Sequence, residues 1–168
     1  MSENTQTTIV VGVTPHQPET VVREAAHLAR ALSAALVCAY VDPAAYVVAE
    51  RDDGSVDARP VDPDGPDWTE PPFDHALAAR LARIATEEGV PLQLRGLAGD
   101  VARALGRLAE TLGSQLLVVG SRSGAKATVQ EYFGGSVAVH LAHRQSRPVL
   151  IVPLAAQADG PLPWEDEA

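Results

Sequence analysis

The sequence predicts an α/β protein built on a doubly wound, five-stranded parallel sheet with helices on both faces. Short aliphatic runs alternate with segments of helical periodicity, and only 4% of the residues are aromatic. Strands that alternate with helices imply βαβ crossovers, which make the strands parallel and cover both faces of the sheet. In such sheets ligands bind beyond the carboxyl ends of the strands, where the strand order reverses. The search for a site therefore begins in the loops at that edge.

The first quarter of the chain predicts two strands and the helix between them. Residues 8–13 and 36–41 are continuous apolar runs, typical of strands buried on both faces of a parallel sheet. Pro18 and Glu19 favour the start of a helix. Proline lacks the backbone N–H, but the first helical turn leaves that group unpaired in any case. A glutamate at this end complements the positive end of the helix dipole. The apolar positions that follow lie on one helical face as far as Leu32.

Residues 43–72 have a different composition, rich in aspartate, proline and glycine and with little periodicity. This pattern predicts a long acidic excursion from the alternating core. A flanking apolar run, residues 44–49, leaves open that part of the excursion packs locally. Its function cannot be deduced from composition.

The rest of the chain resumes the alternation. Gly89 is placed to end a helix, and Asp100 and Ser136 stand where helices begin. The predicted elements are a helix over 73–88, a strand over 91–97, a helix over 100–112, a strand over 116–119, a helix over 136–145 and a strand over 148–152. We expect one domain over residues 1–168, with the acidic tail, residues 154–168, outside the core.

Composition excludes several classes of function. A net charge of −9 argues against nonspecific nucleic-acid binding, which depends on lysine and arginine. The polar N-terminus has no signal-peptide pattern, and no apolar run approaches the length that spans a bilayer, so we expect a cytoplasmic protein without a membrane partner. The lone Cys38 lies in an apolar run, which predicts a buried thiol and no internal disulfide.

The loop from Gly120 to Ser136 is the strongest candidate for a binding site. Its glycines let backbone N–H groups approach an anion, the following helix begins with free donors, and Arg122 and Lys126 add positive charge. The glycines alone fit a sharp turn and close packing equally well. The position of the loop directly after a strand favours the anion site.

At this point the chain resembles the universal stress protein family, from Thr8 to Pro153. The segments that carry the resemblance are Ile9–Val13, Ala39–Pro43, Gly99–Asp100, Leu117–Arg122, Gly135–Val137 and Arg147–Pro153. The resemblance implies the strand order 3-2-1-4-5, with the reversal between the first and fourth strands. It also implies a site for ATP, with Mg²⁺, in a stress-response protein.

Two departures from the family pattern stand out. Many members carry the phosphate loop Gly-x2-Gly-x9-Gly-Ser/Thr, whereas here the stretch between Gly120 and the pair Gly135-Ser136 is two residues longer, and the second glycine falls at Ser123 or shifts to Gly124. ATP-binding members usually have an aspartate at the end of the first strand, where this chain has Thr14. Replacing a charged hydrogen bond, worth about 1.5–3 kcal/mol, by a neutral one of about 0.5–1.5 kcal/mol predicts weaker binding or none.

The resemblance assigns roles residue by residue. Val41 would meet the base through its backbone, and Ser136 with its neighbouring N–H groups would hold phosphate. The full set of carried-over positions is Val13, Thr14, Val41, Gly120, Gly124, Gly135, Ser136 and Val137.

Other polar constellations have ordinary interpretations. His140 and His143 are three residues apart on a predicted helix, but no further ligands are spaced to complete a metal site. His16 lies near the predicted site and is interpreted as a solvated loop residue. No acid–histidine pair accompanies Ser121 or Ser123, and their spacing is not that of a nucleophile elbow. We therefore expect neither catalytic residues nor a metal site.

Three hypotheses of function follow. The first is a regulator that senses or holds ATP without catalysis, and the second is a nucleotide-independent interaction protein of the same fold. The third, ATP hydrolysis, needs a positioned water, metal or base that the sequence does not identify. The last strand is apolar and lies at a sheet edge, which predicts a homodimer through Val149, Leu150, Ile151 and Val152, in agreement with the family habit.

Overall fold

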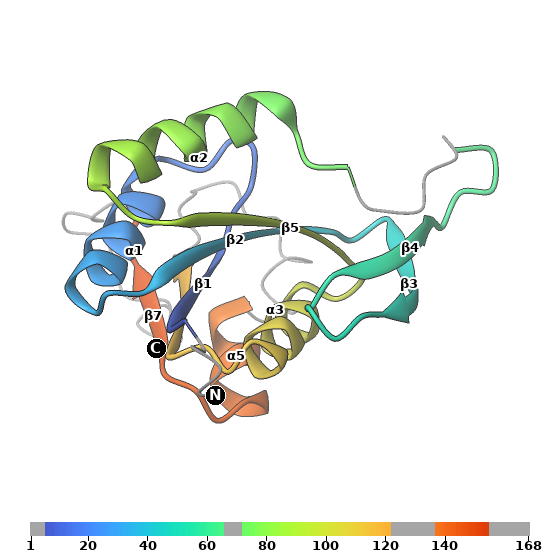
Figure 1. Ribbon diagram of the computed structural model, residues 1–168. Coiled ribbons are helices and arrows are strands. Elements are labelled where there is room, and N and C mark those ends of the chain that lie inside the picture. Colours follow the sequence, from blue (N-terminus) through green and yellow to red (C-terminus); the bar gives the residue numbers. More distant parts are fainter. Residues whose placement is uncertain (1–5, 66–71, 122–136, 155–168) are drawn as a thin grey trace, which may run out of the picture.

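A five-stranded parallel sheet forms the centre of the protein (Figure 1). The computed structural model describes residues 6–65, 72–121 and 137–154. The sheet strands are β1 (Thr8–Gly12), β2 (Ala35–Asp42), β5 (Leu92–Ala98), β6 (Leu116–Gly120) and β7 (Val149–Val152). Their order is β5-β2-β1-β6-β7, and every neighbouring pair is parallel. This confirms the predicted fold class and the order 3-2-1-4-5.

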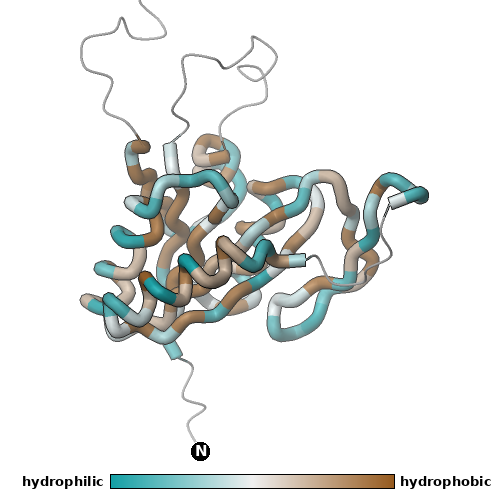
Figure 2. The backbone as a smooth tube through the Cα atoms, turned by 90° about the horizontal axis from the view of Figure 1, so that it is seen from above, coloured by the Kyte–Doolittle hydropathy of each residue, from teal (hydrophilic) through white to brown (hydrophobic). Residues whose placement is uncertain are grey.

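Helices cover both faces of this sheet (Figure 1). Helices α1 (Thr20–Ala31) and α2 (His75–Glu88) pack together on one face, and α3 (Val101–Thr111) and α5 (Val137–Arg144) pack together on the other. Hydrophobic segments run through the strands, whereas hydrophilic ones lie on the outer turns of the helices (Figure 2). No described helix is both long and apolar enough to cross a membrane.

Strand β1 separates the two hydrophobic cores. Ile9 and Val11 belong to the core under α1 and α2, whereas Val10 belongs to the core under α3 and α5, and all three are fully buried. The strand is also paired on both edges, with β2 and with β6. Cys38 on β2 is buried as predicted, and burial raises the pKa of its thiol to about 12, so the thiol stays protonated.

Local signals in the sequence set the helix ends. The Asp74 carboxylate accepts a hydrogen bond from the Leu77 N–H at 2.6 Å, and the Asp100 carboxylate accepts one from the Arg103 N–H at 2.8 Å. These bonds satisfy donors that a first helical turn leaves unpaired. Gly89 ends α2 in the left-handed conformation, with φ of 67°.

The structure differs from the sequence prediction within the excursion, where part of the chain forms an antiparallel hairpin. Its strands are β3 (Ala45–Glu50) and β4 (Val56–Pro60), and within the described part of the chain they pair only with each other. Ala45, Val56 and Ala58 are buried in the core under α3. These tertiary contacts hold the hairpin in place. The sequence gives only a short alternation of apolar and polar residues in β4, which is a weak signal within an acidic, proline-rich segment.

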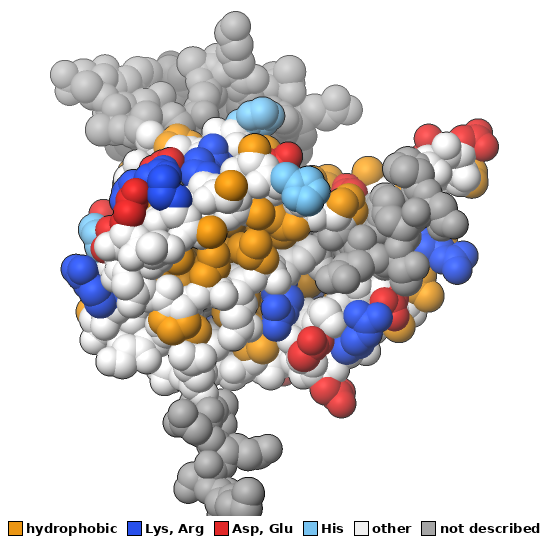
Figure 3. Space-filling view, turned by 45° about the horizontal axis from the view of Figure 1, so that its top comes forward, with side chains coloured by type: hydrophobic (Ala, Val, Ile, Leu, Met, Phe, Trp, Pro, Cys, Tyr) orange, Lys and Arg blue, Asp and Glu red, His pale blue; other side chains and the backbone are white. Residues whose placement is uncertain are grey.

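A network of ion pairs joins α1 to α2. Arg23 contacts Glu19 at 3.1 Å and Glu87 at 2.9 Å, and Arg83 contacts Glu87 at 2.7 Å and also pairs with Glu19. Glu88, whose side chain is only 12% exposed, lies within ion-pair distance of further basic side chains, namely Arg23, His27 and Arg30. Basic and acidic side chains stand side by side on this face in Figure 3.

This network predicts a loss of stability in acid. The hydrogen bond from Arg83 lowers the pKa of Glu19, and bonds from Arg83 and then Arg23 lower that of Glu87, below the ordinary value of 4.5. The stabilisation is therefore complete above about pH 4.5 and is lost as the pH falls through the lowered pKa values. Urea midpoints measured from pH 7 to pH 3 should fall over this range, and less steeply in Arg83→Gln.

Arg59→Gln provides the matched control, because Arg59 is exposed on β4 and has no ion pair among the described residues. This variant should lose stability in acid as the wild type does. Parallel pH profiles for the wild type and Arg83→Gln would contradict the role given to the network.

Candidate functional site

The strand order reverses between β1 and β6, and the segments that follow these two strands diverge there. From β1 the chain continues to α1 on one face of the sheet, and from β6 it continues toward α5 on the opposite face. In doubly wound sheets this divergence opens a crevice at the carboxyl edge. The predicted residues Val13, Thr14 and Gly120 all lie at this edge.

The loop that leaves β1 is held by short hydrogen bonds. The buried Val13 donates its N–H to Ala39 O at 2.9 Å. Thr14 is exposed and exchanges two bonds with Gln17: its N–H donates to Gln17 Oε1, and the Gln17 N–H donates to Thr14 O, both at 3.2 Å. Arg80 of α2 donates from Nη2 to Pro15 O at 2.9 Å. The loop is therefore tied to α2 while Thr14 stays open to solvent.

Val41 presents backbone groups beyond the end of β1. Pairing of β2 with β1 ends with the bond from Val13 to Ala39. Backbone groups of a parallel strand address its two neighbours alternately, so Val41 faces the same neighbour as Ala39. Asp42 faces the other way, where its carbonyl accepts the Gly99 N–H at 3.0 Å. The N–H and C=O of Val41 therefore lie unpaired by the sheet at the site.

Gly120 ends β6 in a crowded position. A Cβ at this residue would lie 2.8 Å from Gln17 Nε2, 3.1 Å from Val21 Cγ2 and 3.2 Å from Leu154 Cδ2. Only glycine lets the strand end approach the β1 loop and α1 this closely. Ser121 then continues the contact with β7, because its N–H donates to Val152 O at 2.8 Å and its hydroxyl accepts the Leu154 N–H at 3.0 Å.

The remaining predicted site residues divide into two groups. Val137 is the first residue of α5 and packs, half-buried, against the core under α3. The predicted phosphate-loop residues lie outside the described residues: Arg122, Gly124, Lys126, Gly135 and Ser136. Within the described ranges, no three His, Cys, Asp or Glu side chains gather to hold a metal ion.

Sequence reasoning missed two residues that shape this edge. Gln17 bonds to Thr14 and lies next to Gly120, and its position four residues beyond the predicted strand end could have indicated it. Arg80 lies 65 positions from Pro15, and no local pattern predicts that contact. Asp42 serves the turn, as its carboxylate accepts the Ala44 N–H at 2.8 Å. Burial and then the charge of Asp42 raise the pKa of Tyr40, which keeps the phenol neutral.

Comparison with known proteins points to one family. The family model described as "Universal stress protein family" matches residues 6–153. Among solved structures, a universal stress protein in complex with cAMP is 24% identical, with 89% of this chain and 98% of that chain covered and a TM-score of 0.59. A search of the curated proteins finds no match.

Two further solved structures share the fold. A universal stress protein from Archaeoglobus fulgidus in complex with dAMP is 17% identical over 87% of this chain and 97% of that chain, with a TM-score of 0.53. A family protein from Arabidopsis thaliana with AMP bound is 17% identical over 89% and 93%, also with a TM-score of 0.53. At these identities the likeness shows the fold.

The close approach at Gly120 predicts a measurable cost for a side chain there. Gly120→Ala should destabilise the protein by about 1–3 kcal/mol in urea unfolding, because Val21 and Leu154 must shift to admit the methyl group. Adding Gln17→Ala should recover part of this loss, since it removes the nearest atom. Gly106→Ala on α3, where a Cβ meets nothing closer than 3.9 Å, serves as control and should not destabilise. Equal stability of Gly120→Ala and wild type would contradict the geometry.

Proposed function

The chain belongs to the universal stress protein family, and from this premise we propose that it binds an adenine nucleotide across the carboxyl ends of β1, β2 and β6. The observation that carries the proposal is the backbone edge of Val41, whose N–H and C=O have no β1 partner among the described residues. An N–H and a C=O side by side match the acceptor and donor on the Watson–Crick edge of adenine. The base would lie past the end of β1, next to Val13 and Thr14.

The phosphate side of the proposal begins at Gly120. This residue brings the backbone against the β1 loop, and the chain beyond it carries Arg122, Lys126 and the pair Gly135-Ser136 ahead of α5. Glycines and a helix N-terminus bind phosphate through backbone N–H groups. Structural neighbours in complex with cAMP, dAMP and AMP support an adenine ligand with at least one phosphate.

The proposed ligand is ATP with Mg²⁺, held for regulation of a stress response and not for catalysis. A role without catalysis is supported by the polar groups at the carboxyl edge of the sheet, because their hydrogen bonds fix the conformation of the loops. Thr14 and Gln17 bond to each other, and the Asp42 carboxylate binds the turn that follows β2. Occupancy of the site would then act on the loop that begins at Gly120.

Titration calorimetry of nucleotide-free protein with ATP and Mg²⁺, repeated with AMP and cAMP at fixed salt, tests this function. We expect saturable binding of one nucleotide per chain. Thr14→Asp should tighten binding about tenfold, because a charged hydrogen bond replaces a neutral one. Thr14→Asn is the matched control, since it has the size of aspartate without the charge.

The substitution Gly135→Val distinguishes the contribution of the phosphate loop to binding from that of the base site. It should abolish the preference for ATP over adenosine while leaving the fold intact, as judged by thermal unfolding. No heat and no thermal stabilisation at millimolar nucleotide would contradict the proposal. The nucleotide-independent interaction protein would then be the better account.

We also propose that two chains associate through β7. This strand pairs only with β6 among the described residues, and its Leu150 and Ile151 are 38% and 48% exposed. Soluble proteins usually cover or pair such apolar edges.

Sedimentation at micromolar concentration should show a dimer for the wild type and a monomer for Ile151→Glu, because the substitution places a charge in the interface. Val48→Glu is the control, as Val48 is 57% exposed on β3, away from β7. A monomeric wild type would contradict this proposal.

A further inference from the structure

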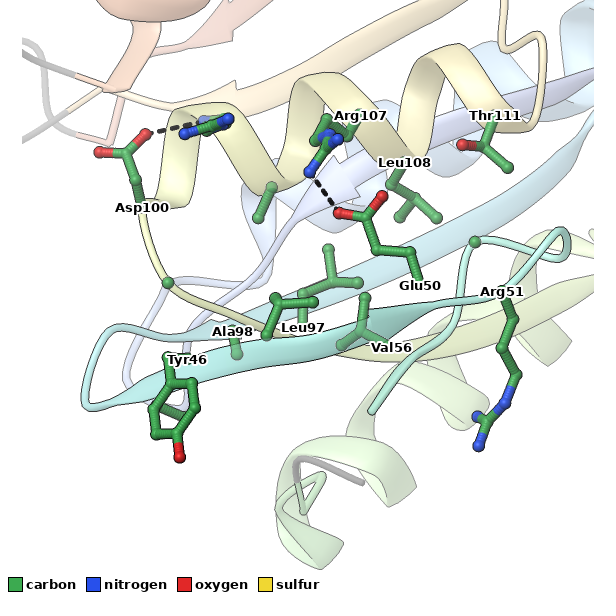
Figure 4. A pocket seen from close by; sticks show the side chains of 16 residues that line it. Tyr46, Glu50, Arg51, Val56, Leu97, Ala98, Asp100, Arg107, Leu108 and Thr111 are labelled. Carbon is green, nitrogen blue, oxygen red and sulfur yellow. Dashed lines mark hydrogen bonds and ion pairs between the residues drawn. The ribbon is translucent and has the colours of Figure 1, made fainter. Parts of the chain in front are cut away.

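A cavity lies between the β3–β4 hairpin and α3, apart from the ends of β1, β2 and β6 considered above. Its volume is about 340 Å³, at the lower end of the range for small-molecule pockets. Its walls come from the hairpin, the end of β5 and one side of α3 (Figure 4). It includes none of the candidate nucleotide residues Val13, Thr14, Val41 and Gly120.

Close contacts hold the hairpin over α3. Gly54 has φ of +79°, and a Cβ there would lie 2.5 Å from Leu108 Cδ1, so the hairpin turn rests directly on the helix. At the rim, Arg107 Nη1 contacts Glu50 Oε1 at 2.5 Å, and in Figure 4 the two side chains point toward each other. The cavity is thus formed between segments that lie far apart in the sequence and are held together by these contacts.

The inner wall of the cavity is apolar and already part of the protein core. Val56, Leu97, Ala98 and Leu108 line it and are all at most 6% exposed. Such a surface favours the apolar body of a ligand, because contact there removes further hydrocarbon from water.

The charged groups of the wall leave one cation without a partner. Glu50 pairs with Arg107, Arg51 pairs with Asp57 and points away from the other labelled residues in Figure 4, and the Asp100 carboxylate caps α3. The Arg103 guanidinium has neither an ion pair nor a hydrogen bond among the described residues. Both carboxylates of the wall, Glu50 and Asp100, are engaged elsewhere, so an acid group for Arg103 would have to come from a ligand.

We propose that this cavity binds a small amphipathic monoanion, with its apolar body against Val56, Leu97 and Leu108 and its acid group on Arg103. Arg103 and Arg107 also border a larger and more open groove between α3 and α5, whereas Ala104 lines only the hairpin cavity and Arg144 lines only the groove. These differences allow the two places to be distinguished by substitution.

Calorimetric titration of the full chain with 1-naphthoate tests the proposal, with neutral 1-naphthalenemethanol as the matched compound. We expect one naphthoate per chain with a dissociation constant of about 1 mM or lower. Arg103→Gln should weaken binding about tenfold, and so should loss of the charge on the ligand. Ala104→Leu, which fills the cavity, should abolish binding. Arg144→Gln and Arg59→Gln should have no effect.

Three results would overturn the proposal: no binding at millimolar naphthoate, weakening by Arg144→Gln with none by Ala104→Leu, or one-for-one displacement of naphthoate by AMP. Thermal unfolding of each variant verifies that it is folded. Because Thr14 does not line the cavity, naphthoate binding that survives in Thr14→Asp keeps this site independent of the proposed nucleotide function.

Discussion

The architecture depends on the burial of β1 from every side. Ile9 and Val11 fill one core, Val10 fills the other, and both edges of the strand are paired. Strand β1 ends at Gly12, which pairs with Ala39, whereas the neighbouring β2 continues to Asp42. This difference in length leaves the N–H and C=O of Val41 beyond the end of β1, without a β1 partner among the described residues. The position of the candidate nucleotide site therefore follows from the packing of the core.

The β3–β4 hairpin adds a second layer to one side of the same framework. It contributes Ala45, Val56 and Ala58 to the core that also contains Val10 and Val41, so it is packed as part of that core. The β5–α3 turn, which lines the cavity of the hairpin, is tied to the end of β2 by the bond from the Gly99 N–H to Asp42 O.

Much of this fold could be predicted from the sequence because local signals and the global fold agree. Runs such as residues 8–12 fit only a strand buried on both faces, and Asp100 and Gly89 mark helix ends by their own chemistry. The hairpin could not be predicted in the same way, since it is held by contacts of Gly54 and Glu50 with α3. At the candidate site, strand order predicts that Val13, Thr14, Val41 and Gly120 lie at the carboxyl edge of the sheet, and their role as ligand contacts stays a prediction. The contact of Arg80 and the cavity wall depend on long-range packing, which no local pattern indicates.

The proposed contact between the backbone of Val41 and an adenine base can be measured in ¹H–¹⁵N spectra of labelled protein titrated with AMP. We expect the Val41 amide resonance to shift saturably, together with that of Thr14, while the amide of Gly106 on the far side of α3 does not move. Saturable binding of AMP that leaves the Val41 amide unchanged would contradict the account and would place the nucleotide elsewhere on the molecule.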